Sequence, residues 1–338
     1  MAQSNVTLYG LLDTGIESIT NQAGSTKTFM PGAGASIPDL YGMKGAEDLG
    51  GGLKAIFQLE GSMNLSTGSN SQAVNSNGGM FGRQAYVGLK GDWGTVKLGL
   101  QIDPAALGMV ETAPDGGSQS FANLPLWINA FLAAGPSSTN TDLSFFDQSS
   151  VSYSYSSNGF TGTVLYSIGG GNGSANSHLS LSGMYENGPL SASAGIIRDT
   201  APSGQNGPSE WSLGGGYDVS DALKLSATYF NIKGGATTSA NFDIYGVGGA
   251  YKISTADTVK VNYYHLGDKV YGGTQKVLSA EYDHALSKRT VLYAEVATAQ
   301  ESNGGFAPNT GSLLDLNGGS FAQGGTVNAL VFGIHHSF

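Results

Sequence analysis

Residues 42–60 of this 338-residue chain read GMKGAEDLGGGLKAIFQLE, and this stretch predicts the fold. From residue 53 onward, apolar and polar side chains alternate. The apolar parity holds Leu53, Ala55, Phe57 and Leu59, and the polar parity holds Lys54, Gln58 and Glu60, with Ile56 as the one exception. Successive side chains of a strand point to opposite faces, so the alternation predicts a strand with one apolar and one polar face. The preceding residues 47–52, EDLGGG, supply glycine for a tight turn.

The same alternation recurs along the whole chain. It is found at residues 223–229, 259–264, 292–296 and 330–338. Short turn segments occur at 91–94, 186–189, 218–221 and 287–289, and longer connections rich in Gly, Ser, Asn and Thr at 21–36, 61–79, 169–177, 200–210, 233–241 and 300–325. Short and long connections alternate. A β-sandwich does not need that regularity, whereas a membrane barrel with tight turns at one end and long loops at the other does. We therefore predict a single domain over residues 1–338.

The composition is compatible with a β-barrel in a membrane and excludes several other classes. No apolar run approaches the 18 or so residues of a transmembrane helix. In hydrocarbon, β structure is stable only as a closed barrel, because every backbone polar group needs an internal partner. The 53 glycines, 12% charged residues and absence of Cys suit tight turns and an uncharged lipid-facing half. The net charge of −10 disfavours a nucleic-acid partner. We predict an all-β, transmembrane antiparallel β-barrel in contact with membrane lipid.

Two further features concern the ends of the chain and the barrel rims. Residues 1–4, MAQS, contain no basic or apolar stretch, so we expect an exported protein whose signal peptide is absent from this sequence. Aromatic residues near strand ends are expected to form interfacial girdles. The candidates are Tyr9, Tyr217, Tyr229, Tyr251, Tyr263 and Phe338.

Residues 103–146 form the longest stretch without clean alternation. They contain four of the ten prolines and an apolar patch over residues 124–131. Loops longer than about 15 residues in a compact domain usually carry function. We predict that this loop folds back onto the protein.

The sequence offers no convincing catalytic or metal-binding motif. His335 and His336 are adjacent, so on a strand they point to opposite faces and cannot hold one metal together. The remaining histidines, His178, His265 and His284, are far apart without ligand spacing. We therefore expect no catalytic residues, no metal and no cofactor. Two alternatives stay open: a barrel hydrolase, which needs a Ser or Asp nucleophile beside a His on one face, and a non-conducting adhesin.

Six segments resemble the general porins of Gram-negative bacteria, in their β-proteobacterial branch. They are residues 9–16, 42–60, 81–89, 187–193, 286–290 and 333–338, in order along the whole chain. The resemblance implies an outer-membrane homotrimer of barrels with about 16 strands each, through which ions and small hydrophilic solutes diffuse passively. It also implies that the third loop, here about residues 103–146, folds into the lumen. The C-terminal Phe338 would be the signal recognised by the barrel-assembly machinery.

The chain departs from this family at the pore wall. Such porins set a cluster of arginines on the wall, facing acidic residues on the third loop. Arg83 matches one of these positions, whereas Leu40 and Phe146 stand at two others. Leu40 shares parity with Lys44, and Phe146 shares parity with Ser150, so parity supports a pore-facing direction for these candidates. Arg83 shares parity with Val87 and Leu89, so its pore-facing direction rests on the resemblance alone. The expected constriction wall is therefore Leu40, Lys44, Arg83 and Phe146. Because charge in the narrow part sets selectivity, we predict a constriction less anion-selective than its relatives.

The loop supplies the other side of the predicted constriction. Its candidate residues are the carboxylates Glu111, Asp115 and Asp142 and the apolar Trp127. The carboxylates would provide negative charge opposite the wall, and Trp127 would provide a less polar strip.

Overall fold

The computed structural model describes residues 5–22, 25–32, 34–71, 79–114, 145–168, 177–200, 204–235, 240–302 and 325–338. Its strands are β1 (Asn5–Gln22), β2 (Ser25–Phe29), β3 (Leu40–Gly50), β4 (Leu53–Met63), β5 (Asn70–Ser71), β6 (Gln84–Gly91), β7 (Gly94–Ile102), β8 (Phe146–Ser157), β9 (Phe160–Ser167), β10 (His178–Asn187), β11 (Leu190–Thr200), β12 (Asn206–Asp218), β13 (Leu223–Lys233), β14 (Asn241–Lys252), β15 (Asp257–Asp268), β16 (Thr274–Ala285), β17 (Thr290–Glu301) and β18 (Thr326–Ser337). One helix, α1 (Pro104–Thr112), follows β7.

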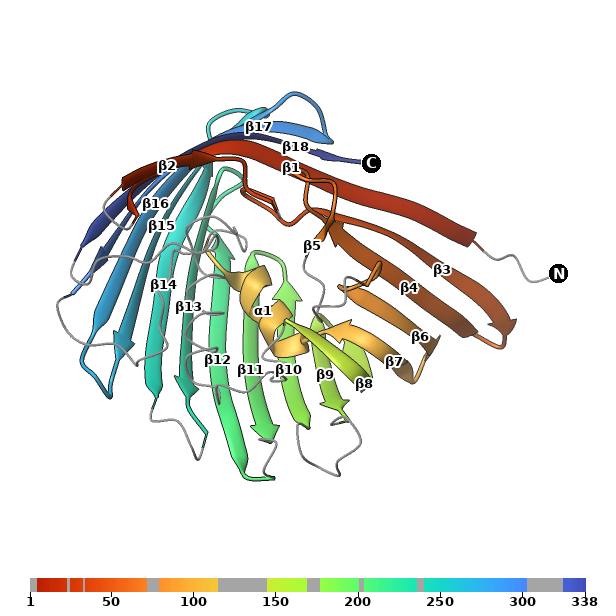
Figure 1. Cartoon of the computed structure of the whole chain (residues 1–338). Helices are drawn as coiled ribbons and strands as arrows, with labels where there is room; N and C mark the ends of the chain where they lie inside the picture. Colours follow the sequence, from red (N-terminus) through yellow and green to blue (C-terminus); the bar gives the residue numbers. More distant parts are fainter. Residues whose placement is uncertain are drawn as a thin grey trace.

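The strands form one closed antiparallel sheet, the barrel of Figure 1. Closure depends on the 18-residue strand β1, which pairs with β3 along one edge and with the last strand, β18, along the other. The register runs from Leu11 opposite Ser337 to Ile19 opposite Ala329. Apart from the short strands β2 and β5, the described residues contribute sixteen strands to the barrel wall. The predicted strand number is therefore confirmed.

Tight turns and long connections lie at opposite ends of the barrel. The turn between β3 and β4 is made by Gly50, Gly51 and Gly52, all with positive φ of 85°, 61° and 82°. Such angles are accessible to glycine without steric cost, which explains the GGG of the opening stretch. At the same end, short connections also join β6 to β7, β8 to β9, β10 to β11, β12 to β13, β14 to β15 and β16 to β17.

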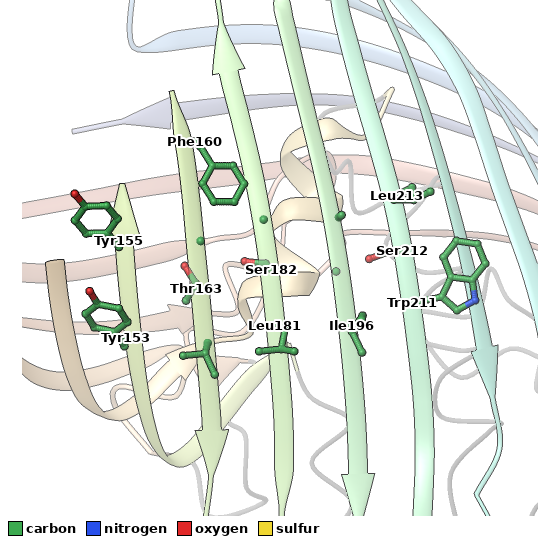
Figure 2. Close-up of a pocket in the computed structure, with 15 residues that line it drawn as sticks. Tyr153, Tyr155, Phe160, Thr163, Leu181, Ser182, Ile196, Trp211, Ser212 and Leu213 are labelled. Atoms are coloured by element: carbon green, nitrogen blue, oxygen red, sulfur yellow. The ribbon is translucent and has the colours of Figure 1, made fainter. Parts of the chain in front are cut away.

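The outer face of the barrel is apolar and exposed. Leu8, Ile16 and Leu213 are 69%, 60% and 52% exposed. Figure 2 shows part of this face over β8 to β12, where Trp211 and Tyr153 border an apolar hollow of about 670 Å³. Exposed apolar side chains on one face of most of the strands are the pattern of a barrel surrounded by lipid.

The girdle assignment is wrong for one residue. The Tyr9 hydroxyl donates a hydrogen bond to Glu60 Oε2 over 2.8 Å, and this contact lies on the inner face of the barrel. Tyr9 has the opposite parity from the exposed Val6 and Leu8, so its ring faces inward. By contrast, Tyr217 and Tyr251 are 51% and 53% exposed near the tight-turn end of the barrel.

The inner face is not polar throughout. From β13 to β16 it carries a buried apolar cluster, made of Phe230, Ile232, Phe242, Ile244, Tyr264, Leu266 and Val277. The predicted alternation of polar and apolar faces therefore applies to the tight-turn halves of these strands but not to their other halves. None of the helices among the described residues is long and apolar enough to cross a membrane.

Candidate functional site

Helix α1 lies inside the barrel, against the inner face of β10, β11 and β12 (Figure 1). The backbone N–H of Ala105 donates to Ser180 Oγ on β10 over 3.3 Å. At the other end of the helix, the hydroxyls of Thr112 and Ser193 share a hydrogen bond of 2.8 Å. The chain thus turns inward at the start of the 103–146 stretch.

The sequence encodes this helix through its first residues. The side chain of Asp103 accepts a hydrogen bond from Ala106 N over 2.7 Å, and Pro104 occupies the first turn. An Asp cap followed by Pro is a strong helix start, because the cap satisfies a free N–H and proline has no N–H to satisfy. Periodicity does not predict this helix, because it is only 9 residues long and lies in a stretch without a regular apolar pattern.

Glycines in the wall make room for α1. A Cβ atom on Gly195 would lie 2.7 Å from Ala105 Cβ, and one on Gly214 would lie 1.9 Å from Thr112 Oγ1. A Cβ on Gly248 of β14 would lie 2.8 Å from Pro114. The path from Ala105 to Pro114 therefore crosses the inner face from β11 to β14 in direct contact with the wall.

The start of α1 is fixed by a buried group of polar side chains. His178 Nε2 lies 2.8 Å from Asp103 Oδ2, and His178 Nδ1 lies 2.5 Å from Asp199 Oδ1. Asp147 Oδ1 of β8 lies 3.5 Å from His178 Nε2. Three carboxylates thus converge on one imidazole, one from the cap of α1, one from β8 and one from β11.

Arg83 is in contact with a carboxylate and with an aromatic ring. Its Nε donates to Glu60 Oε1 over 2.8 Å, and its guanidinium lies 5.0 Å from the centre of the Phe146 ring. All three residues are buried. The positive charge of Arg83 is therefore offset by a neighbouring carboxylate and covered by an aromatic ring.

The other wall candidates are spread along the first strands. Leu40 is half-buried at the start of β3 and is paired with Leu11. Lys44, four residues further along, is exposed, and its ammonium lies 5.1 Å from the centre of the Tyr9 ring. Lys97 is similarly placed, 4.6 Å from the Tyr86 ring.

Counting residues from Ser150 does not place the side chain of Phe146, which is located instead by the contact of its ring with the Arg83 guanidinium. The ladder between β7 and β8 shifts register between Gly99 and Gln101, and Ser149 has a positive φ of 49°. Such an extra residue is a β-bulge, which reverses the alternation on its far side. As a result, the buried Asp147 stands opposite Gln101.

The loop candidates are only partly within the described residues. Glu111 lies on α1 with an exposed side chain. Asp115, Trp127 and Asp142 lie outside the residues that the structure describes.

A closed barrel with an apolar outer face and a helix turned into its lumen is the architecture of an outer-membrane channel. The sequence profile described as Gram-negative porin matches residues 1–304. The chain belongs to the Gram-negative porin family. This porin is accordingly an outer-membrane protein that forms a channel for passive diffusion of small solutes.

Individual relatives agree along the full length of this porin. It is 29% identical to outer membrane porin protein 32 of Delftia acidovorans, over all of this chain and 95% of the relative. It is 28% identical to an outer membrane porin protein of Bordetella pertussis, with the same coverage. The solved anion-selective porin from Comamonas acidovorans matches with a TM-score of 0.82 and 27% identity, covering 99% of this chain and 100% of that one.

Several polar contacts in the lumen of this porin are not predictable from the sequence. Glu60 stands out there only as a polar position of a strand, and His178 has no ligand spacing because it is 75 residues from Asp103. Sequence spacing carries no signal for such contacts, because strands far apart in the chain become neighbours only when the barrel closes.

Proposed function

We propose that this porin conducts ions and small hydrophilic solutes through a constriction that lacks anion preference. The solved Comamonas acidovorans relative is described as anion-selective. The observation that carries the proposal is the pairing of Arg83 with Glu60, because it offsets the wall arginine that this chain retains.

Other inner-face charges support the same proposal. Lys260 of β15 lies 2.7 Å from Glu281 and 2.9 Å from Asp283, so its charge is also offset by carboxylates. Near α1, three carboxylates surround the single imidazole of His178. Leu40 and Phe146 contribute no charge where the family pattern has arginine. The ion selectivity of a channel follows from the charge that lines its narrow part, so a lumen with these charges should not favour chloride.

The constriction itself would be completed by the loop that α1 begins. The direction of α1, from His178 toward Pro114 and β14, supports a loop of about residues 103–146 that crosses the lumen. Glu111, Asp115 and Asp142 would then supply carboxylates opposite Lys44, and Trp127 an apolar surface.

The assembly proposed for this chain is a homotrimer without enzymatic activity. One solved structure that shares the fold is described as a trimer form. Phe338 is proposed as the signal for the barrel-assembly machinery. Its N–H donates to Gly10 O over 3.0 Å, and its own carbonyl accepts from Gly10 N over 3.2 Å. The terminal residue therefore makes the last pair of backbone hydrogen bonds between the first and last strands. Chemical cross-linking of the folded protein tests the proposed trimer.

The proposal is tested by single-channel conductance in planar bilayers, with one ion replaced at a time. Replacing chloride by the slower acetate should lower the conductance no more than replacing potassium by the slower lithium, after correction for bulk mobility. An anion-selective pore would lose much more conductance with acetate, which would contradict the proposal. A folded barrel that never conducts would instead favour an adhesin or a barrel hydrolase.

A further inference from the structure

We propose that Asp103, Asp147 and His178 form a binding site for a divalent transition-metal ion inside the barrel. The three residues come from the cap of α1, from β8 and from β10. One ligand atom from each lies within 4.8 Å of the other two, which is the spacing of ligands around one metal ion. All three residues are buried.

Asp147 is the residue that points to a missing ligand. It is 1% exposed, and neither of its carboxylate oxygens accepts a hydrogen bond from any residue that the structure describes. His178 Nε2 lies 3.5 Å from Asp147 Oδ1 and 2.8 Å from Asp103 Oδ2, so both carboxylates approach the same ring nitrogen. A buried carboxylate that accepts no hydrogen bond is costly, whereas a cation between the two carboxylates and the imidazole would satisfy it.

Asp199 prepares His178 to act as a ligand. Its Oδ1 lies 2.5 Å from His178 Nδ1, so the proton of a neutral imidazole would be held on Nδ1. The lone pair of Nε2 would then point toward Asp103 and Asp147. Carboxylate, histidine and metal in series are common in proteins, because the outer carboxylate fixes the tautomer and the ring orientation.

Asp103 has one oxygen for each of two tasks. Its Oδ1 caps α1 by accepting from Ala106 N, while Oδ2 faces His178. A metal bound to Oδ2 would therefore tie the first turn of α1 directly to β8 and β10. Binding of the ion and docking of the helix would stabilise each other.

The ligand set defines the chemical class of the ion. An imidazole nitrogen suits zinc, nickel, copper and iron, whereas magnesium and calcium prefer oxygen ligands throughout. Two carboxylates and one imidazole give three protein ligands, so water would complete the coordination of a zinc ion. The competing arrangement has a protonated His178 paired with the carboxylates and no bound ion.

Zinc titration of the folded, chelator-treated protein in detergent tests the proposal by calorimetry. We expect one zinc ion per chain. Asp199→Asn, which removes the outer carboxylate, should weaken binding about 10- to 100-fold, and Asp147→Asn should weaken it at least as much. His284→Gln is the matched control, because His284 also lies 2.8 Å from an aspartate, Asp257, but is partly exposed near the tight-turn end. This control should bind zinc as the wild type does.

A second measurement uses the wild-type protein alone. Cobalt(II) bound to one nitrogen and several oxygens at low coordination number should give visible absorption bands. These bands should disappear when added zinc displaces the cobalt. Wild-type protein that binds neither ion, or that binds zinc as tightly after Asp147→Asn, would overturn the proposal and favour the protonated arrangement. Loss of zinc binding in His284→Gln would also overturn it, because binding would then belong to the outer rim.

Discussion

Arg83 and Glu60 form a buried ion pair on the inner wall of the barrel, with Nε and Oε1 2.8 Å apart. The side chains are only 7% and 6% exposed. Salt screens buried pairs much less than surface pairs, so the carboxylate offsets the guanidinium even at high ionic strength. The effective charge at this wall position is therefore set by two residues and not by the arginine alone.

Glu60→Gln should increase the chloride permeability of the channel. The amide keeps the size of the side chain but leaves the Arg83 charge unbalanced. In water, one unit charge changes the energy of an ion about 8 Å away by about 0.5 kcal/mol. This corresponds to about a twofold change in the ratio of chloride to potassium permeability. The ratio is measured with bi-ionic potentials on a single channel.

The control for this change is Glu47→Gln, which removes an exposed carboxylate at the tight-turn end of β3. It should leave the ratio unchanged. If Glu60→Gln also left it unchanged in a folded channel, Arg83 would have no influence on selectivity.

Leu40→Arg should favour entry of anionic sugars. Leu40 is half-buried at the start of β3, at a position where the resemblance to the porins leads us to expect arginine. Swelling of liposomes with gluconate should become faster relative to a neutral sugar of the same size. Ser156→Arg adds the same charge near the tight-turn end of β8 and should have a smaller effect. Equal effects of both substitutions would show that any lumen charge suffices.

Gly214→Ala should destabilise the barrel and displace α1. The new Cβ atom would lie 1.9 Å from Thr112 Oγ1, on the helix face that hydrogen-bonds to Ser193. Overpacking of this kind costs about 1–3 kcal/mol. Gly215→Ala is the matched control, because its Cβ atom would have no contact closer than 3.6 Å, to Ser191 O. Thermal unfolding should separate the two variants, and equal midpoints would contradict the docking of α1.

Asp39 should make stability depend on pH. Burial is the main cause that raises the pKa of Asp39 from 3.8 to about 7. The N–H of Asp13, which donates to Asp39 Oδ1 over 2.6 Å, lowers this pKa, and the neighbouring Asp13 carboxylate raises it. Between about pH 4 and pH 7, Asp39 of the folded protein therefore retains a proton that the unfolded chain has released. The stabilisation present below about pH 4 should be lost as the pH rises to about 7, by at most about 1.4 kcal/mol per pH unit.

Asp39→Asn should remove this part of the pH dependence. Its free energy of unfolding in lipid vesicles, compared with the wild type between pH 4 and 8, measures the effect. Parallel curves for the two proteins would rule out the proposed role of Asp39.

The sequence predicted the barrel well because each strand carries its own signal. Alternation and turn glycines are local, as at residues 42–60, and they indicate the strand pattern and the two distinct ends. The site was predicted less well. The bulge at Ser149 reverses parity at a single residue, and the helix after Asp103 is too short to show periodicity.

Contacts between distant strands were beyond the reach of the sequence. Arg83 meets Glu60 and His178 meets Asp103 only after the sheet closes and α1 turns inward. Its residue type makes Tyr9 a candidate for the outer girdle, whereas its hydrogen bond to Glu60 places it inside the barrel. Residue type alone does not reveal which face of a strand an aromatic occupies.

The zero-current potential of the wild-type channel across a KCl gradient tests the central claim most directly. If the permeabilities of potassium and chloride are nearly equal, the potential will be near zero. If the potassium permeability is larger, the potential will have the sign set by cations. We expect that result, because Arg83 is offset by Glu60 and the positions of Leu40 and Phe146 carry no charge. A large potential of the sign set by chloride would contradict it.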